Sequence, residues 1–235
     1  MIWEALRARG VREGDPVGWP AFMSVDGLGG GPFTAAGTSS ALVAAYDRRI
    51  GPGRWTSPVD AGDAVAVRFP SEDRANAGYH IEGSYEGLGG YWVNVRSRAR
   101  GLLALLLFTD VGPDDAPTRL VSGSHRYVPE FLASHGEAGT LSEGEFWRPS
   151  VLCRPVVHAT GEAGDVFLCH PFLVHTATWP HRGSGPRMIA QPAVQVRDGF
   201  TLDGSDPSPV AQAIVAGLAM AGQDRSPAGA ISGGA

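Results

Sequence analysis

The chain of 235 residues contains no lysine, and all 19 of its basic residues are arginine. Chemistry that depends on lysine, such as Schiff-base formation or phosphate binding by a Walker-type lysine, is therefore excluded. Any anion must be bound by arginine, by backbone N–H groups or by hydroxyl groups. The 24 acidic residues give a net charge of −5, so nucleic acid is not an expected partner.

Long apolar runs and cysteines are also scarce. The longest uninterrupted apolar run, Leu102–Phe108, is far shorter than the roughly 20 residues of a transmembrane helix. The first residues, Met-Ile-Trp-Glu, lack the basic start and apolar stretch of a signal peptide. Cys153 and Cys169 are too few for a disulfide framework and are interpreted as buried thiols. We therefore expect a cytoplasmic protein with no membrane partner.

Apolar residues make up 43% of the chain, which is enough for a substantial core. The pattern predicts one domain over residues 1–222, followed by a small, polar and disordered tail over 223–235. Many short apolar stretches separated by turn residues predict a mainly β sandwich or barrel with flanking helices. Helices are predicted over 2–9, 41–50 and 209–220, and an irregular loop over 18–37. Strands are predicted over 64–69, 78–85, 102–109, 119–122, 151–158, 165–170 and 187–196, with a helical or irregular excursion over 130–146.

The chemistry is concentrated in two segments. His80 and Glu82 are two positions apart, so on a strand their side chains would point to the same side. They would supply two ligands of a 2-His-1-carboxylate triad, the arrangement that leaves open positions on Fe(II). His175 follows a buried strand and could complete the triad, and Arg187, twelve positions later, could pair with a carboxylate. On ligand type alone, zinc stays open as the metal.

Four segments resemble, in order, motifs of the phytanoyl-CoA dioxygenase family. They are GYHIEGSY (78–85), LFTDVGPDDAPTRLVSGSH (107–125), AGDVFLCHPFLVHTATWPHRGSGPR (163–187) and SPVAQAIVAGL (208–218). The resemblance implies a double-stranded β-helix of jelly-roll type, with Fe(II), the cosubstrate 2-oxoglutarate, O₂ and a small-molecule substrate. It implies metal ligation by His80, Glu82 and His175, binding of the cosubstrate carboxylate by Arg187, and a place for Thr118 near the cosubstrate.

One ligand departs from the family pattern. The family usually has Asp where this chain has Glu82, which is one methylene longer but supplies the same oxygen donor. Related halogenases lack this carboxylate, so Glu82 favours hydroxylation or a related oxidation. Two alternatives stay open: a cupin-like metal enzyme that does not use 2-oxoglutarate, and a catalytically silent binding protein on the same scaffold. Arg187 distinguishes the first alternative, since such an enzyme would not need it.

Three arginines alternate at the end of this first ligand region. Arg96, Arg98 and Arg100 could meet an anionic substrate, but a solvated face is the favoured interpretation. Two further histidines, His125 and His170, are interpreted as structural residues rather than ligands. The sequence predicts neither the identity of the substrate nor the oligomeric state.

Overall fold

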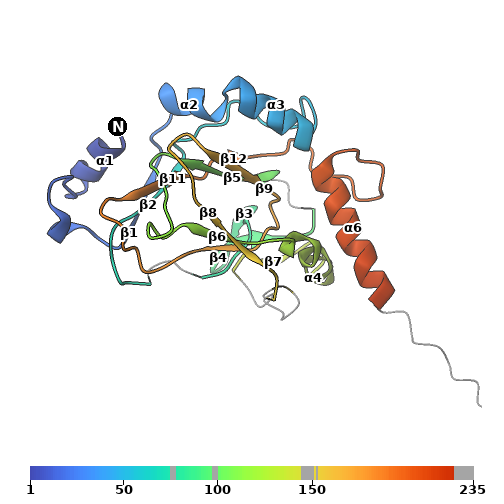
Figure 1. Cartoon of the computed structure of the whole chain (residues 1–235). Coiled ribbons are helices and arrows are strands. Elements are labelled where there is room, and N and C mark those ends of the chain that lie inside the picture. Colours follow the sequence, from blue (N-terminus) through green and yellow to red (C-terminus); the bar gives the residue numbers. More distant parts are fainter. Residues whose placement is uncertain (75–77, 97–99, 144–150, 152, 225–235) are drawn as a thin grey trace, which may run out of the picture.

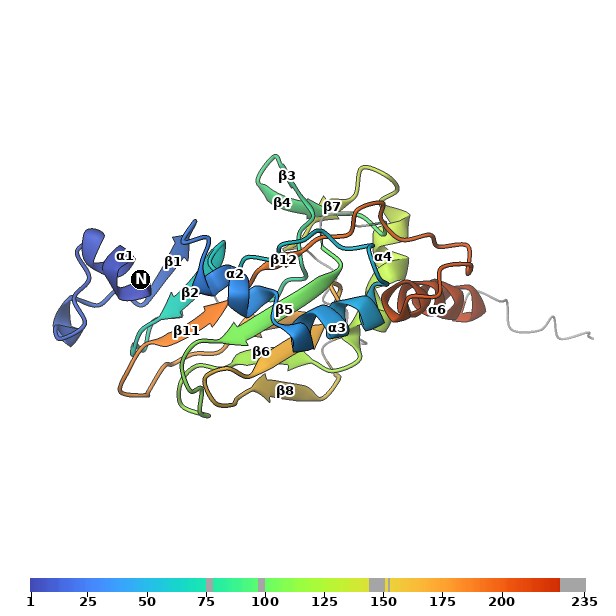
Figure 2. The ribbon, with the colours of Figure 1, turned by 90° about the horizontal axis from the view of Figure 1, so that it is seen from above.

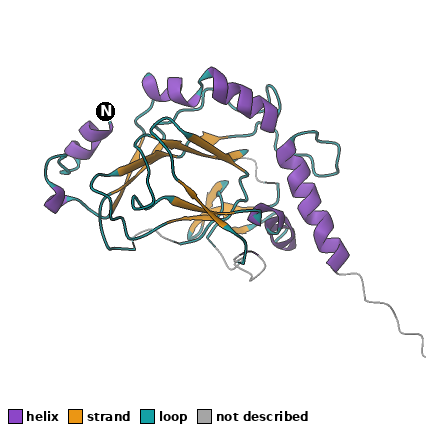
Figure 3. Cartoon of the chain, viewed as in Figure 1, coloured by secondary structure: helices purple, strands orange, loops and turns teal. Residues whose placement is uncertain are grey.

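The protein consists of two facing β layers, made of three sheets, with helices on the outside (Figures 1 and 3). The computed structural model describes residues 1–74, 78–96, 100–143, 151 and 153–224. In this part of the chain, no helix is long and apolar enough to cross a membrane. The mainly β architecture with curled antiparallel sheets confirms the predicted jelly-roll class.

The larger sheet is antiparallel and has the order β1-β2-β11-β5-β12, with β9 also paired to β5. All six residues of β5 are buried, because the strand is covered on both faces. This confirms the prediction that a continuous leucine-rich run forms an internal strand. The strands are β1 (Phe22–Asp26), β2 (Ala64–Arg68), β5 (Leu102–Leu107), β9 (Val166–Cys169), β11 (Arg187–Ala190) and β12 (Ala193–Val194).

The second layer faces this sheet across an apolar interior. It contains the sheet β10-β6-β8 and a smaller sheet, β3-β4-β7. Alternate side chains of β5, together with Leu120, Leu173 and Ile189, form one buried cluster between the layers. The strands are β3 (Tyr85–Gly87), β4 (Gly90–Val93), β6 (Thr118–Val121), β7 (Thr140–Leu141), β8 (Val156–Ala159) and β10 (His175–Ala177).

Helices cover the outer face of the larger sheet. Figure 2 shows α2 and α3 lying along β5, while α1 lies at the β1 end. Val65, Val67, Met188 and Ala190 point to this face and belong to the larger apolar core. At the other end of the molecule α4 packs on α6. The helices are α1 (Ile2–Ala8), α2 (Pro32–Gly37), α3 (Ser40–Arg49), α4 (Val128–Ser134) and α6 (Pro209–Asp224), with short 3₁₀ turns η1 (Pro16–Gly18) and η2 (Ser124–Arg126).

Several predicted elements differ from those observed. The segment 18–37 was expected to be an irregular loop, but it contains β1 and α2; β1 exists through its pairing with β2, which local patterning does not reveal. The predicted strand 187–196 is two strands, separated at Gln191-Pro192, because proline cannot donate to the ladder. In the predicted strand 151–158, only Val156 and later residues are in β8.

The C-terminal boundary and one cysteine also differ from expectation. Helix α6 continues to Asp224, so the predicted tail 223–235 begins too early, and residues 225–235 lie outside the described part of the chain. Cys153 is exposed rather than buried, whereas Cys169 is half-buried in β9. Burial raises the pKa of the Cys169 thiol to about 11, so this cysteine is an inert thiol at neutral pH.

Candidate metal centre and cosubstrate site

The two ligand segments meet through a short backbone pairing. His80 and His175 form an isolated antiparallel bridge, with both N–H···O distances at 3.0 Å. The Glu82 N–H donates to the carbonyl oxygen of Pro171 at 3.1 Å. The prediction of a strand over 78–85 is wrong, because only Tyr85 belongs to a strand. The bridge to His175, rather than strand alternation, places His80 and Glu82 in the site.

Both histidines have one ring nitrogen fixed by the backbone. The Nδ1 of His80 lies 2.9 Å from the carbonyl oxygen of Gly78, and the Nδ1 of His175 lies 2.9 Å from that of Leu173. Each Nδ1 therefore donates to a carbonyl oxygen, and Nε2 is the ring nitrogen that could bind a metal. The Nε2 of His175 is buried and has no hydrogen-bond partner. Burial, with His80 and Arg100 adding to it, holds the pKa of His175 well below its ordinary value, so the imidazole is neutral.

The carboxylate of Glu82 lies between His175 and an arginine. One oxygen, Oε1, is 3.6 Å from the Nε2 of His175, and the other, Oε2, accepts a hydrogen bond from Arg100 at 2.9 Å. The next residue, Gly83, has no room for a side chain, because a Cβ there would lie 2.4 Å from the Cβ of Tyr91. The carboxylate is thus held by one oxygen while the other faces the histidine.

A polar cavity of about 230 Å³ opens at this point. His80, Glu82 and Arg100 line it together with Tyr91 and Gln191. The expectation that the arginines form a solvated face is therefore wrong for Arg100, which is only 25% exposed. Arg96 does lie at the surface, 3.6 Å from Glu137, and Arg98 lies outside the described residues.

The three predicted ligands are adjacent, but they do not form a closed triad. The rings of His80 and His175 have their centroids 4.2 Å apart. Among the residues that the structure describes, no group of three His, Cys, Asp or Glu side chains is arranged to hold a metal ion. Closure of the triad would therefore need the His80 ring or the Glu82 carboxylate to reorient.

Arg187 lies in the interior between the two sheets. It is the first residue of β11 and shares a face with Ile189, which belongs to the interior cluster. Its guanidinium donates a 2.7 Å hydrogen bond to the carbonyl oxygen of Ala116, across the gap between the layers. Thr118, two residues further on, is buried and is the strand partner of Ala177. Thr118 is therefore two residues from Ala116, which contacts Arg187, and it lies on the strand that pairs with β10, which begins at His175.

The remaining histidines of these segments have structural contacts. His170 accepts the N–H of Phe172 at one ring nitrogen and contacts the carbonyl oxygen of Val210 with the other. Its ring stacks on that of His125, with centroids 4.9 Å apart. Burial lowers the pKa of His170 to about 3. These contacts agree with the predicted structural role of both residues.

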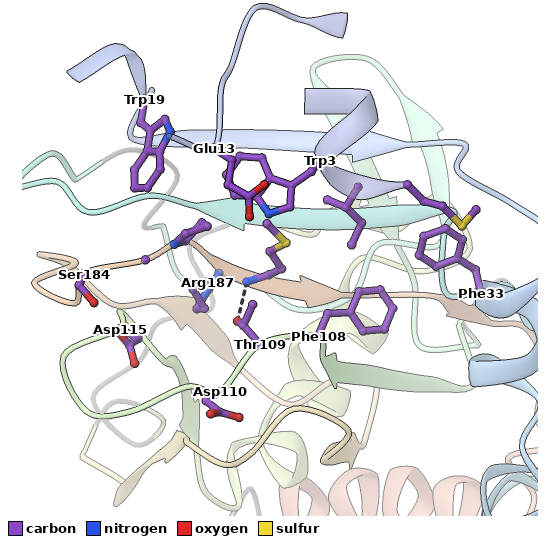
Figure 4. A pocket seen from close by; sticks show the side chains of 15 residues that line it. Trp3, Glu13, Trp19, Phe33, Phe108, Thr109, Asp110, Asp115, Ser184 and Arg187 are labelled. Carbon is purple, nitrogen blue, oxygen red and sulfur yellow. Dashed lines mark hydrogen bonds between the residues drawn. The ribbon is translucent and has the colours of Figure 1, made fainter. Parts of the chain in front are cut away.

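Arg187 lines a second, larger cavity of about 710 Å³, separate from the cavity that His80 and Glu82 line (Figure 4). Trp3, Glu13 and Trp19 of the N-terminal segment form one wall, and Asp110, Asp115 and Ser184 form the opposite wall. Arg187 lies between these walls. His80, Glu82 and Arg100 line the smaller cavity, so the candidate metal centre opens through that one.

Comparison with known families and structures gives one consistent result. The family model described as Phytanoyl-CoA dioxygenase (PhyH) matches residues 90–189, which include Thr118, His175 and Arg187 but not His80 or Glu82. No curated protein matches the chain.

Solved structures resemble the chain at low identity. SnoN, a non-haem α-ketoglutarate-dependent epimerase from nogalamycin biosynthesis, is 20% identical over 83% of this chain and 72% of its own, with a TM-score of 0.52. A putative oxidoreductase of Salmonella typhimurium LT2 is 12% identical over 84% and 63%, with a TM-score of 0.57. HygX of Streptomyces hygroscopicus, solved with nickel, 2-oxoglutarate and hygromycin B, is 18% identical over 84% and 79%, with a TM-score of 0.49. The resemblance read from the sequence is thereby confirmed: residues 90–189 carry the pattern of the phytanoyl-CoA dioxygenase family, and the fold is similar to that of SnoN.

Proposed function

We propose that the protein is a non-haem Fe(II)- and 2-oxoglutarate-dependent oxygenase that oxidises a small organic molecule. In this reaction 2-oxoglutarate and O₂ are consumed, and succinate and CO₂ accompany the oxidised product. The observation that carries the proposal is the His80–His175 bridge, which brings two imidazoles beside the Glu82 carboxylate. Arg187 lies in the same interior, four residues before Gln191 of the polar cavity.

The donor set fits iron. Two imidazoles and one carboxylate are the ligands of the 2-His-1-carboxylate triad. The Nε2 of His175 is buried, unpartnered and unprotonated, which is the form that a metal needs. When bound, iron and 2-oxoglutarate would supply oxidising chemistry that side chains lack.

The chain's own residues would position and protect these groups. His80, Glu82 and His175 would hold the metal, with the Nδ1 contacts to Gly78 and Leu173 fixing the ring orientations. Arg187 would orient the cosubstrate through its distal carboxylate, with Thr118 beside it. The interior leucines exclude water from this side of the site. Because the Glu82 carboxylate would occupy a metal position, the proposed outcome is hydroxylation or a related oxidation, not halogenation.

An anaerobic titration tests this proposal. Metal-free protein would receive Fe(II) and then 2-oxoglutarate while the visible spectrum is recorded. We expect a weak charge-transfer band that appears only when both are present and saturates with 2-oxoglutarate. If iron binds but no band forms at any concentration of 2-oxoglutarate, the protein uses its metal in another way, and the cupin-like alternative replaces the oxygenase.

Arg100 is expected to position the carboxylate ligand. Because it holds Oε2 of Glu82, Arg100→Leu should leave that carboxylate without its orienting partner and lower the affinity for Fe(II) by about 10–100-fold. Arg100→Lys, which keeps a charged donor, should recover part of the loss. The measurement is anaerobic competition with a chelator, and Arg96→Leu at the surface is the matched control. Unchanged iron affinity in Arg100→Leu would refute this role.

A further inference from the structure

Two buried arginines lie side by side at one end of the interior. The antiparallel register of β2 and β11 pairs Arg68 directly with Arg187. They are 2% and 4% exposed. Directly opposed strand partners point to the same face, and like charges in that position destabilise a sheet. Burial increases the repulsion between the two charges, because both are removed from water.

Both guanidinium groups belong to the interior rather than to the outer, helix-covered face. Arg187 shares a face with Ile189, and the register places Arg68 on that same face. The Arg68 guanidinium lies 5.5 Å from the centroid of the Phe22 ring. Burial and the charge of Arg68 lower the pKa of Arg187 to about 9, and burial also lowers the pKa of Arg68. Arginine side chains in proteins are effectively always protonated. The interior thus holds two adjacent positive charges.

Further donors lie at the same end. His181 is 3% exposed, and its Nδ1 accepts the N–H of Gly183, so its Nε2 carries the proton. That Nε2 and the Nε of Arg187 are buried and have no hydrogen-bond partner among the described residues. Within the same part of the chain, Arg187 has no carboxylate partner. Asp73 acts on Arg68 and Asp115 on His181, but in each case burial has the larger effect on the pKa.

We propose that Arg68 and Arg187 together bind the distal carboxylate of 2-oxoglutarate, and that Arg68 makes the site selective for dicarboxylic over monocarboxylic 2-oxo acids. The inference rests on the proposed function. A carboxylate has about four acceptor positions, so it can accept bonds from two guanidinium groups at once. Its negative charge would offset the repulsion between the two arginines. The cost of the pair in the empty protein is therefore recovered when the cosubstrate binds.

The test compares two ligands that differ only at the distal end. In anaerobic titrations of Fe(II)-loaded protein, 2-oxoglutarate carries the distal carboxylate and 2-oxobutyrate lacks it. We expect Arg68→Met to weaken binding of 2-oxoglutarate by about ten-fold, the effect of losing one charged hydrogen bond, and to leave 2-oxobutyrate unchanged. Arg182→Met is the matched control, because Arg182 is 64% exposed beside Glu72 in the neighbouring loop.

A second readout uses the metal-free protein. Arg68→Met should reduce the stabilisation, measured as the shift in melting temperature, that glutarate gives relative to butyrate. Equal losses for 2-oxoglutarate and 2-oxobutyrate, or no loss for either, would show that Arg68 is only structural. If the wild type gave no band with 2-oxoglutarate, the proposed function would fail, while the comparison of glutarate with butyrate would still decide the role of Arg68.

Discussion

Replacement of His175 by alanine is expected to abolish turnover and to lower iron affinity by more than about a hundred-fold. The expected loss of affinity is larger than the roughly 10–100-fold loss caused by removing a group that only orients a metal ligand. His175 is buried, neutral and paired to His80 through its backbone, and its free Nε2 faces Oε1 of Glu82. No other described side chain could replace this nitrogen, since both ring nitrogens of the nearby His170 have structural contacts. The measurements are succinate formation and anaerobic iron binding.

Two variants separate loss of a ligand from loss of the fold. His175→Gln keeps much of the side-chain volume and the backbone bridge, so it should fold like the wild type and still lack activity. His158→Ala, on the exposed face of β8, is the matched control and should retain turnover. Substantial succinate formation by a folded His175→Ala variant, at a rate near that of the wild type, would exclude His175 as a ligand.

Much of the fold was predictable because some elements have local causes. The leucine-rich run of β5 is buried on both faces, and α3 starts directly after its N-cap residue Ser39 and ends before Gly51, as the sequence signals for helix ends predict. Strand β1 was missed because Phe22–Asp26 lies in a region rich in glycine and proline, and its structure depends on pairing with β2. Long-range pairing of this kind leaves no local pattern to detect.

In the candidate site, too, some residues could be predicted from local sequence and others only from long-range contacts. His80, Glu82, His175, Arg187 and Thr118 were selected from spacing and resemblance, and the structure brings them to one interior, although the strand predicted for His80 and Glu82 does not exist. Arg100 was expected on a solvated face because it alternates with Arg96 and Arg98. It lies eighteen positions after Glu82 in the sequence, so their ion pair could be found only from the fold.

Arg68 illustrates why charge in a strand is hard to interpret from sequence. In AVAVRF, an arginine at the end of an apolar run is typical of a strand end that reaches solvent. Only the register with β11 places it beside Arg187 and inside the protein. In a chain without lysine, two buried arginines are also the groups available for anion binding. Their shared position gives that end of the interior a positive charge that neither residue predicts alone.

Replacement of Arg187 by methionine is expected to weaken 2-oxoglutarate binding by about a hundred-fold, since truncating one partner of a buried charged pair costs 2–5 kcal/mol or more. The loss should exceed that of Arg68→Met, because Arg187 is already fixed by its bond to the carbonyl oxygen of Ala116 and lacks a carboxylate partner within the described chain. The measurement is the 2-oxoglutarate concentration that half-saturates the charge-transfer band.

Iron affinity provides the control for this variant. Arg187 is not placed among the metal ligands, so Arg187→Met should bind Fe(II) as the wild type does, and a high concentration of 2-oxoglutarate should restore the band. A variant that loses iron as well would indicate a damaged fold rather than a lost carboxylate contact. If Arg187→Met retained full turnover and wild-type affinity for 2-oxoglutarate, the cosubstrate would have to bind elsewhere. Arg187 would then be a structural residue, held by its hydrogen bond to the carbonyl oxygen of Ala116, and not the anchor of the cosubstrate carboxylate.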